Sequence, residues 1–227
     1  MKPIIIFIEG NIGAGKTTFL KNINTNKYKI QKLFEPVDQW IASGMLNKFY
    51  KDPEKYSYEF QIYCLKTRFN LFNKIDKTKD FIFIERSPMC DKHVFANVCL
   101  KNKPELLQKY YNVWDHYMNN IYKEKYNYPY HFLYINETSD NCYNHIYNRG
   151  RSEEINISLE YLKELENKHN NWFNNFSQIF CENFTYHTKD KSCYINTQNL
   201  DIRKEDDVRL IVNNTINFII TYYSNKN

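Results

Sequence analysis

Short and almost uninterrupted apolar runs alternate along the chain with longer segments in which apolar residues return every three or four positions. The runs predict buried strands and the longer segments predict amphipathic helices. The predicted strands are Pro3–Ile8, Tyr28–Phe34, Phe81–Ile84 and Pro129–Ile135, with an edge strand at Cys193–Ile195. The predicted helices are Lys16–Asn24, Pro53–Lys77, Lys92–Leu100, Glu105–Glu124, one from Asp140, Ser158–Phe176 and Asp207–Tyr222. This alternation is typical of a three-layer α/β fold with a parallel sheet of about five strands flanked by helices.

The first strand runs directly into a glycine-rich turn, and the segment Ile4–Thr18 reads IIIFIEGNIGAGKTT. It satisfies the phosphate-loop pattern GxxxxGK[ST] in the strand-to-helix context that the pattern requires. Glycines leave room for backbone N–H groups to converge on phosphates, and the start of the following helix points its positive end at the same anion. Lys16 is expected to reach the β- and γ-phosphates and Thr17 to ligate Mg²⁺. The residues expected to bind the nucleotide are Gly10, Asn11, Ile12, Gly13, Ala14, Gly15, Lys16, Thr17 and Thr18.

Length and composition narrow the class of protein. The 227 residues contain no linker rich in Pro, Gly or Ser, so we expect residues 1–227 to form a single domain. No run is long enough to span a bilayer and the first strand leaves no room for a signal peptide, so we expect a cytoplasmic protein without a membrane partner. The six cysteines are far apart and suggest neither a zinc site nor a disulfide framework. The net charge of +5 comes from scattered Lys and Arg, which favours a small polyanionic substrate over a nucleic-acid partner.

Two predicted strands each end in a carboxylate close to a proline. Proline cannot continue the hydrogen-bond ladder, so Glu35 and Glu85 are expected at the carboxyl edge of the sheet, where α/β folds bind ligands. Glu85 is well placed there to hold Mg²⁺, directly or through water. Arg86 beside it is suited to bind phosphate or to orient Glu35. On position alone, Glu35 is more simply explained as a solvated carboxylate at a strand end.

Polar residues also interrupt the apolar face of the predicted helix Pro53–Lys77. Gln61 and Arg68 are seven residues apart and therefore share a face, which predicts that this face lines a cavity. An Arg68 side chain that extends to the rim is the alternative. Farther along, Arg149 and Arg151 flank a glycine within residues 148–156. They predict a lid that closes over a triphosphate, with a solvated charged loop as the simpler reading.

Taken together, five separated motifs closely resemble the deoxynucleoside kinase family, which includes deoxycytidine kinase, deoxyguanosine kinase and mitochondrial thymidine kinase. The motifs are IEGNIGAGKTT, EPVDQW, FYKDP with FQIYCLKTR, ERS and YNRGRSEEINISLEYL, which span about three quarters of the chain. The resemblance implies a phosphate-loop NTPase-type fold with an arginine-bearing lid. It also implies an Mg²⁺-dependent enzyme of nucleotide salvage that transfers the γ-phosphoryl group of ATP, or another NTP, to the 5′-hydroxyl of a deoxynucleoside. Family members are generally dimers, which makes the helices around Pro53–Lys77 and Glu105–Glu124 candidates for an interface.

The resemblance also implies roles for individual residues. It implies that Glu35 is the general base for the 5′-hydroxyl and is held by Arg86. It also implies that Glu85 and Thr17 bind Mg²⁺, and that Arg149 and Arg151 belong to the lid. The residues implied to bind the nucleoside are Trp40 and Tyr50 as pocket walls, Tyr50 and Glu154 at the 3′-hydroxyl, and Gln61 at the base edge. Aromatic walls with a few directed polar groups suit a flat base and a neutral sugar.

Arg68 and Asp91 bear on the choice of base. By resemblance, an arginine and an aspartate at these positions accompany kinases of deoxycytidine and purine deoxynucleosides, so these substrates are favoured over thymidine. His145 departs from the family, because close relatives carry a further lid-helix arginine there. The segment around Asn199–Asp207, which in the family binds the donor base, matches poorly and leaves the donor preference open.

Other readings of the motifs remain open. A thymidine kinase of the same family would share them. A thymidylate kinase would share the fold and the phosphate loop but would need a second phosphate site, and it typically shows a DR pair where this chain has Glu85-Arg86-Ser87. A phosphate-loop switch would want a DxxG element and a water-positioning residue, which the sequence lacks.

Overall fold

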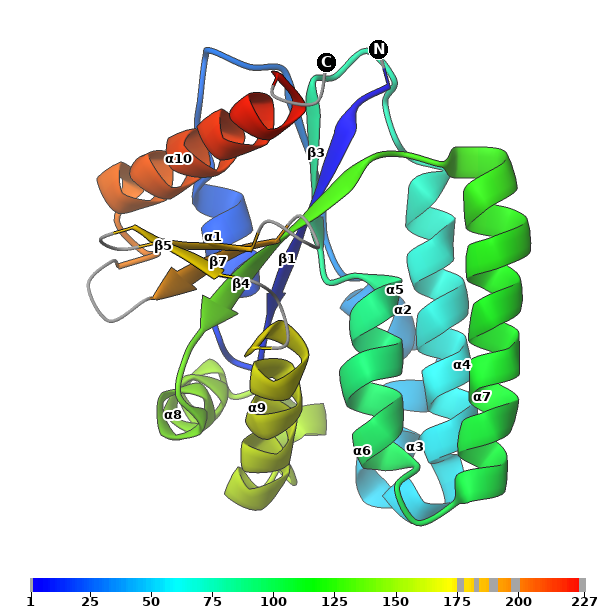
Figure 1. The fold of residues 1–227 in the computed structure, drawn as a ribbon. Coiled ribbons are helices and arrows are strands. Elements are labelled where there is room, and N and C mark those ends of the chain that lie inside the picture. The colour runs from blue at the N-terminus through cyan, green and yellow to red at the C-terminus, as the bar shows by residue number, and fades with distance from the viewer. Residues whose placement is uncertain (1, 175–177, 182–183, 188–191, 197–200, 225–227) are drawn as a thin grey trace.

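The computed structural model of the chain describes residues 2–174, 178–181, 184–187, 192–196 and 201–224. Within them a sheet is flanked by helices on both faces, as predicted (Figure 1). Its strands are β1 (Ile4–Gly10), β2 (Ile30–Leu33), β3 (Phe81–Glu85), β4 (Tyr130–Asn136), β5 (Gln178–Cys181), β6 (Phe184–His187) and β7 (Ser192–Asn196). The spatial order is β2-β3-β1-β4-β7-β6-β5. Strands β2, β3, β1, β4 and β7 run parallel, and β6 and β5 continue the sheet in antiparallel pairing.

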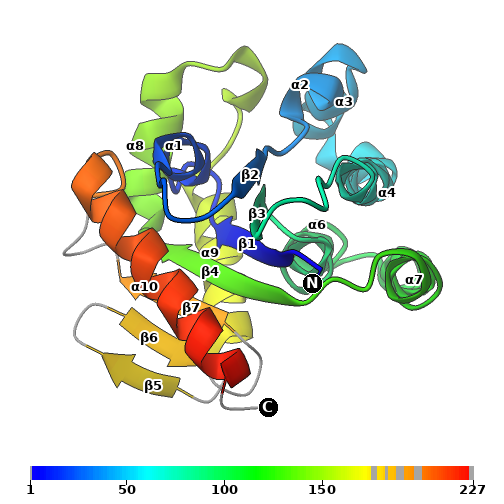
Figure 2. The same ribbon diagram turned by 90° about the horizontal axis from the view of Figure 1, so that it is seen from above.

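Strand β1 is the middle one of the five parallel strands and is buried on both faces. Its alternation sends Ile6 and Ile8 to one apolar layer, and Ile5 and Phe7 to the other. The first layer packs under α1 (Lys16–Asn22) and α10 (Glu205–Ser224), and the second packs against α4 (Pro53–Phe72) and α7 (Pro104–His116). Figure 2 shows these helix pairs on opposite sides of the sheet. A strand buried on both faces explains why the sequence reads there as an unbroken apolar run.

The remaining helices surround the carboxyl ends of the strands. They are α2 (Val37–Ala42), α3 (Met45–Lys51), α5 (Pro88–Cys90), α6 (Asn97–Cys99), α8 (Ser139–Arg149) and α9 (Leu159–Asn174), with a short 3₁₀ turn at Ser152–Glu154. Two wider π-helical stretches, Asp91–Ala96 and Tyr117–Tyr126, continue α5 and α7. None of the helices in the described part of the chain has the combination of length and apolar surface that crossing a bilayer requires.

Several predicted elements differ from the observed ones. The prediction of an edge strand at Cys193–Ile195 is wrong, because β7 lies between β4 and β6 and the β5–β6 hairpin forms the edge beyond it. Helices α2 and α3 were not predicted. The helix expected from Lys92 begins earlier, at Pro88, where Pro88 takes the first turn and Ser87 Oγ caps it by accepting from Cys90 N at 3.1 Å. The predicted helix end at Phe176 lies outside the described residues.

Candidate active site

A cavity of about 1000 Å³ opens at the carboxyl ends of β1, β2 and β3. The sequence-predicted residues that line it are Ile12, Gly13, Gly15, Lys16, Thr17, Thr18, Glu35, Trp40, Tyr50, Gln61, Arg68, Glu85, Arg86, Asp91, Arg149, Arg151 and Glu154. Of the other residues of the loop, Gly10 ends β1, and Asn11 and Ala14 are buried behind the loop surface. The fold therefore brings together residues that lie up to 142 positions apart, from Ile12 to Glu154.

The phosphate loop folds as a tight turn between β1 and α1. Gly13 and Gly15 have φ angles of 81° and 84°, a region that favours glycine. A Cβ atom at Gly13 would collide with the Cys142 carbonyl, and one at Gly15 would collide with the Ile202 side chain. The glycines thus provide the conformation of the loop and let the Cys142 carbonyl and the Ile202 side chain approach it closely. A glycine-rich loop at the start of a helix suits the phosphates of a nucleotide.

Lys16 folds back over this loop. Its Nζ donates to the carbonyl oxygens of Gly10 at 3.1 Å and Asn11 at 2.6 Å, and the side chain is buried. Burial, and to a lesser degree the nearby Arg86 guanidinium, lower the pKa of Lys16 to about 8. The lysine is therefore mainly protonated at neutral pH and carries a cation at the floor of the loop.

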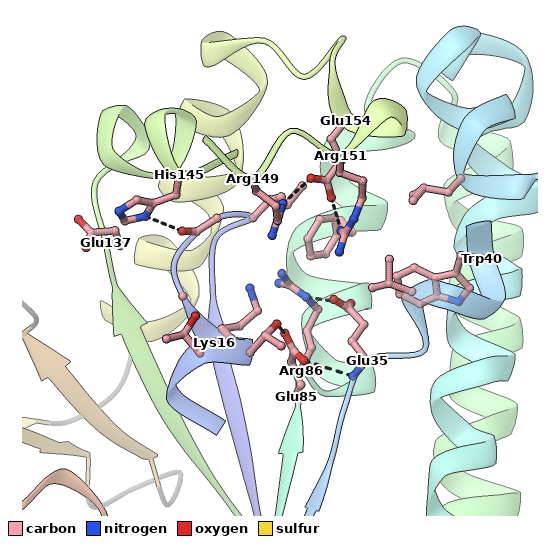
Figure 3. Close-up of a pocket in the computed structure, with 18 of the residues that line it drawn as sticks. Lys16, Glu35, Trp40, Glu85, Arg86, Glu137, His145, Arg149, Arg151 and Glu154 are labelled. Atoms are coloured by element: carbon pink, nitrogen blue, oxygen red, sulfur yellow. Dashed lines mark hydrogen bonds and ion pairs between the residues drawn. The ribbon is translucent and has the colours of Figure 1, made fainter. Parts of the chain in front are cut away.

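Two oxygen ligands suited to Mg²⁺ meet beside the loop. Thr17 Oγ1 donates to Glu85 Oε1 at 2.6 Å, and Glu85 Oε2 accepts from the Glu35 backbone N–H at 3.4 Å. Hydroxyl and carboxylate oxygens are the ligand types that Mg²⁺ prefers. The donor set therefore fits the ion, with Glu85 linking the end of β3 to the loop that carries Glu35 (Figure 3).

A buried network of four charges fills the opposite side of the cavity. Glu35 Oε1 lies 2.6 Å from Arg68 Nη2 and 3.2 Å from Arg86 Nε. Arg68 Nε also donates to both Asp91 oxygens, at 2.9 Å and 2.8 Å. Burial raises the pKa of Glu35, but Arg68 and Arg86 outweigh it and hold that pKa at about 2. Arg68 is only 4% exposed, so the alternative in which it extends to the rim is wrong.

Aromatic side chains from α2, α3 and α4 wall this part of the cavity. Trp40 packs edge-on against Phe60, with ring centroids 5.7 Å apart, and its Nε1 donates to Thr67 Oγ1 at 2.8 Å. The Arg68 guanidinium lies 5.2 Å from the centre of the Trp40 ring. Burial, and then the nearby Glu154 carboxylate, raise the pKa of Tyr50 well above its usual value, so its phenol stays protonated. A flat pocket with directed polar groups results.

The arginine-bearing loop is closed onto a carboxylate. Arg149 Nη2 pairs with Glu154 Oε2, and Arg151 Nη1 lies 2.6 Å from Glu154 Oε1. Gly150 between them ends α8 with a φ of 64°, a left-handed conformation that favours glycine, and a Cβ atom at this position would contact no neighbouring atom. The arginine side chains are 37% and 28% exposed, whereas that of Glu154 is 5% exposed. One buried carboxylate therefore gathers both cations above the phosphate loop (Figure 3).

The cavity also has lining residues that were not among the predicted site residues. Phe95 lies under Arg86, whose guanidinium is 4.6 Å from the ring centre, and Tyr161 contributes from α9. His145 on α8 approaches the phosphate loop, with Nδ1 2.9 Å from Gly13 O. Residues 201–204 and Asp207 line the cavity beside Gly15. Tyr161 lies in a segment that was predicted as a helix with no role given to this residue. The family resemblance pointed to the segment around Asn199–Asp207, but no local pattern shows that residues 201–204 return to the loop.

Comparison with known proteins agrees with this geometry. A sequence model described as deoxynucleoside kinase matches residues 6–220. The chain belongs to the deoxynucleoside kinase family. Similar proteins include a probable deoxycytidine kinase of Fowlpox virus (strain NVSL), 33% identical over 170 residues that cover 74% of this chain and 70% of that protein. A putative kinase of Invertebrate iridescent virus 6 is 34% identical over 165 residues, covering 73% of this chain and 80% of that protein.

Human deoxycytidine kinase is 31% identical over 193 residues, which cover 74% of this chain and 74% of that protein. The resemblance read from the five motifs is thereby confirmed. Membership in the deoxynucleoside kinase family makes the chain a nucleoside kinase, a nucleotide-binding phosphotransferase.

Proposed function

We propose that this kinase transfers the γ-phosphoryl group of ATP to the 5′-hydroxyl of a deoxynucleoside and yields the deoxynucleoside monophosphate for nucleotide salvage. The observation that carries the proposal is the position of Glu35. Its carboxylate lies at the end of β2, in the same cavity as the phosphate loop, and is paired with Arg68 and Arg86 at 2.6 Å and 3.2 Å. A phosphate-loop switch has no use for such a carboxylate beside an aromatic pocket.

Glu35 is proposed to receive the proton of the 5′-hydroxyl. Both of its ion pairs engage Oε1, so we assign Oε2 to the hydroxyl. Because its pKa is about 2, Glu35 is ionised throughout the neutral range and can orient the hydroxyl by accepting its hydrogen bond. As the bond between the hydroxyl oxygen and the γ-phosphorus forms, the hydroxyl becomes acidic and its proton passes to Glu35, while the bond to ADP breaks. Arg86 and Arg68 keep the carboxylate in place.

The donor side is proposed to hold the triphosphate between the phosphate loop and the lid. Residues 10–18 surround the phosphates, Lys16 leaves its two carbonyl partners for them, and Arg149 and Arg151 approach from above. Thr17 and Glu85 would hold Mg²⁺, which when bound neutralises phosphate charge. Positioning and charge stabilisation supply most of the acceleration in this chemistry.

The acceptor pocket is proposed to favour deoxycytidine and purine deoxynucleosides over thymidine. Arg68 is fixed by both oxygens of Asp91, so the pair presents a rigid pattern of charge to the base, while Trp40 and Tyr50 form walls. Gln61 is buried, and its Oε1 has no hydrogen-bond partner among the described residues, which suits pairing with a base edge. Tyr50 and Glu154 are assigned to the 3′-hydroxyl.

The test is phosphorylation of thymidine, deoxycytidine, deoxyadenosine, deoxyguanosine and thymidylate side by side, with ATP and Mg²⁺, compared by kcat/KM. The proposal expects a monophosphate product from deoxycytidine or the purines, at least about tenfold above thymidine. A preference for thymidine would contradict the role of Arg68 and Asp91 in base selection but would still agree with phosphoryl transfer to a deoxynucleoside. Turnover of thymidylate alone would contradict the nucleoside reading.

We also propose that the enzyme acts in the cytoplasm as a homodimer, with α4 and α7 at the interface. On α7 only Tyr110 is buried, and several other apolar residues, including Leu106, Tyr111 and Trp114, are partly exposed. An interface would remove that apolar surface from water. Light scattering of the purified enzyme measures the assembly directly: the mass of a dimer is expected, and a monomer at micromolar concentration would contradict it.

A further inference from the structure

Arg86 adopts a backbone conformation that arginine rarely takes. Its φ is 65°, and Asn127 is the only other residue besides glycine with a positive φ in the described ranges. Such a conformation is energetically unfavourable for a residue with a side chain and persists only where the surroundings impose it. Because Arg86 is one of the two arginines that pair with Glu35, the groups that impose its conformation bear on the proposed reaction.

The backbone beside Arg86 is held by the last residues of β1. Arg86 N–H donates to Ile8 O at 2.9 Å, and its Nη1 donates to Gly10 O at 2.9 Å. The next N–H, that of Ser87, donates to Glu9 Oε1 at 2.8 Å. The Glu9 side chain thus holds the Ser87 end of the turn. The carbonyl groups of its two chain neighbours hold Arg86 itself.

Glu9 is an unusual side chain for this position. It follows Ile5 and Phe7 on the same face of β1, where those neighbours are core residues, and it is 0% exposed. Its Oε2 has no hydrogen-bond partner among the described residues. Burial raises the pKa of Glu9 to about 7, although Arg86 opposes the shift. Burying a carboxyl group costs free energy, and an apolar side chain would fill the same space without that cost. The hydrogen bond that Glu9 accepts from the Ser87 N–H therefore suggests a role for the carboxyl group beyond packing.

The surroundings of Glu9 favour hydrogen bonding over metal binding. Ligand atoms of Glu9, Cys90 and His169 lie within 4.8 Å of one another, and His169 Nδ1 is 2.8 Å from Leu165 O. However, Arg86 Nη1 is 3.5 Å from Cys90 Sγ, which would place a permanent positive charge beside a divalent cation. Burial also raises the pKa of the Cys90 thiol well above its usual value and keeps it protonated.

We propose that Glu9 is a positioning residue for phosphoryl transfer, because it accepts the Ser87 N–H and so holds Arg86 in the conformation from which its guanidinium pairs with Glu35. The inference rests on the proposed function of Glu35. Glu9 touches neither substrate; it acts through the Arg86 turn. It is also the residue that precedes the phosphate loop, so one side chain couples the end of β1 to the end of β3.

Two variants of nearly equal size separate this role from simple packing. Glu9→Gln keeps an oxygen acceptor for Ser87, whereas Glu9→Met keeps the length of the side chain without one. We expect kcat of Glu9→Met to fall about 10- to 100-fold with the nucleoside KM nearly unchanged, and kcat of Glu9→Gln to stay within about threefold of wild type. Phe7→Leu, on the same face of β1, is the matched core control: it should lower the melting temperature and leave kcat per folded molecule unchanged.

Amide hydrogen exchange at Ser87 gives a readout that needs no enzymatic activity. Slow exchange is expected in wild type and Glu9→Gln, and faster exchange in Glu9→Met. If the wild type phosphorylates no deoxynucleoside, the proposed function fails while this exchange still decides whether Glu9 holds the turn.

Three results would overturn the inference. The first is a folded Glu9→Met enzyme with wild-type kcat, and the second is an unprotected Ser87 amide in the wild type or in Glu9→Gln. The third is a metal analysis that finds one zinc ion per chain in the wild type and none in Glu9→Gln, because Glu9 would then be a metal ligand. Should Glu9→Met not fold, the exchange measured in the wild type and Glu9→Gln decides alone.

Discussion

Two groups of charges line the cavity and differ in how deeply they are buried. Figure 3 shows Glu35 of one group facing Arg149, Arg151 and Glu154 of the other. In the acceptor group, Glu35, Arg68 and Asp91 have side-chain exposures of 13%, 4% and 1%. Arg68 lies on α4 and Asp91 begins the π-helical stretch after α5, while Glu35 lies in the short loop after β2. In the lid group, Arg149 and Arg151 are 37% and 28% exposed, flank Gly150 and share the Glu154 carboxylate. The acceptor group is almost fully enclosed, whereas the lid group is partly open to solvent and, under the proposed function, has partners that a triphosphate would replace.

The difference in burial suits the two proposed tasks, which are proton transfer at Glu35 and closure of the lid over the phosphoryl donor. A base that must receive one proton from one hydroxyl gains from a fixed position, because misplacement by about 1 Å costs about 100-fold in rate. A lid must open for the donor and close over it, so its contacts have to be strong enough to gather the arginines and weak enough to exchange. Burial distinguishes the two cases more clearly than the number of ion pairs does.

The largest expected effect comes from removing one cation of the acceptor group. Arg68→Met leaves Asp91 and part of Glu35 buried without their partner, so the free energy of unfolding should fall by about 3–5 kcal/mol. The matched lid variant, Arg151→Met, should lose less than about 1 kcal/mol, because its pair is partly exposed. Urea unfolding at pH 7 measures both. Equal losses would show that the two groups are held alike.

The next effect is a pH dependence from Glu9. Its pKa in the folded protein is raised from the usual 4.5 to about 7, so the folded state keeps a proton that the unfolded state has released between these values. Stability from this group is therefore full below about pH 4.5 and is lost as pH rises through 7, by about 3 kcal/mol in all.

Glu9→Gln removes this titration, so the variant should gain on the wild type between pH 5 and pH 8, as followed by the urea midpoint. Other titrating groups cancel in the comparison. A difference between the two proteins that stays constant with pH would mean that Glu9 is already ionised in the folded state.

A smaller effect is expected at the lid. Arg151→Met should lower kcat/KM for ATP by about 10- to 100-fold through the loss of one guanidinium beside the transferred group. The nucleoside dissociation constant should change by less than about threefold, since the acceptor group is untouched. Steady-state kinetics and equilibrium binding measure the two quantities. An unchanged kcat/KM for ATP in Arg151→Met would contradict the lid and favour the alternative in which residues 148–156 form a solvated charged loop.

The parts of this site that could be predicted from the sequence are those encoded locally. The phosphate loop, and the carboxylates Glu35 and Glu85 at strand ends, lie in segments whose apolar runs, glycines and prolines reveal both the element and its edge. The seven-residue spacing of Gln61 and Arg68 likewise placed both on the cavity face of α4. The resemblance to the family added roles to positions that chemistry had already marked.

Other parts depend on topology and could not be read from short segments. The internal place of β7 in the sheet follows from its pairing with the β5–β6 hairpin, while its own residues look like those of an edge strand. The contact of Arg68 with Asp91 joins α4 to the π-helical stretch after β3, and the contact of Ile202 with Gly15 crosses most of the chain. Glu9 was hidden because it lies inside a run that reads as apolar.

The central claim is that Glu35 receives the proton of the nucleoside hydroxyl within a site that is already assembled. Glu35→Gln tests it most directly, because the amide keeps the size of the side chain and a hydrogen-bond acceptor but has almost no basicity. The account predicts that turnover falls by about 10²- to 10⁴-fold while the deoxynucleoside dissociation constant, measured by calorimetry, stays within about threefold of wild type. Near-normal turnover would remove Glu35 from this role, and lost binding with unchanged kcat would make it a substrate-binding residue only.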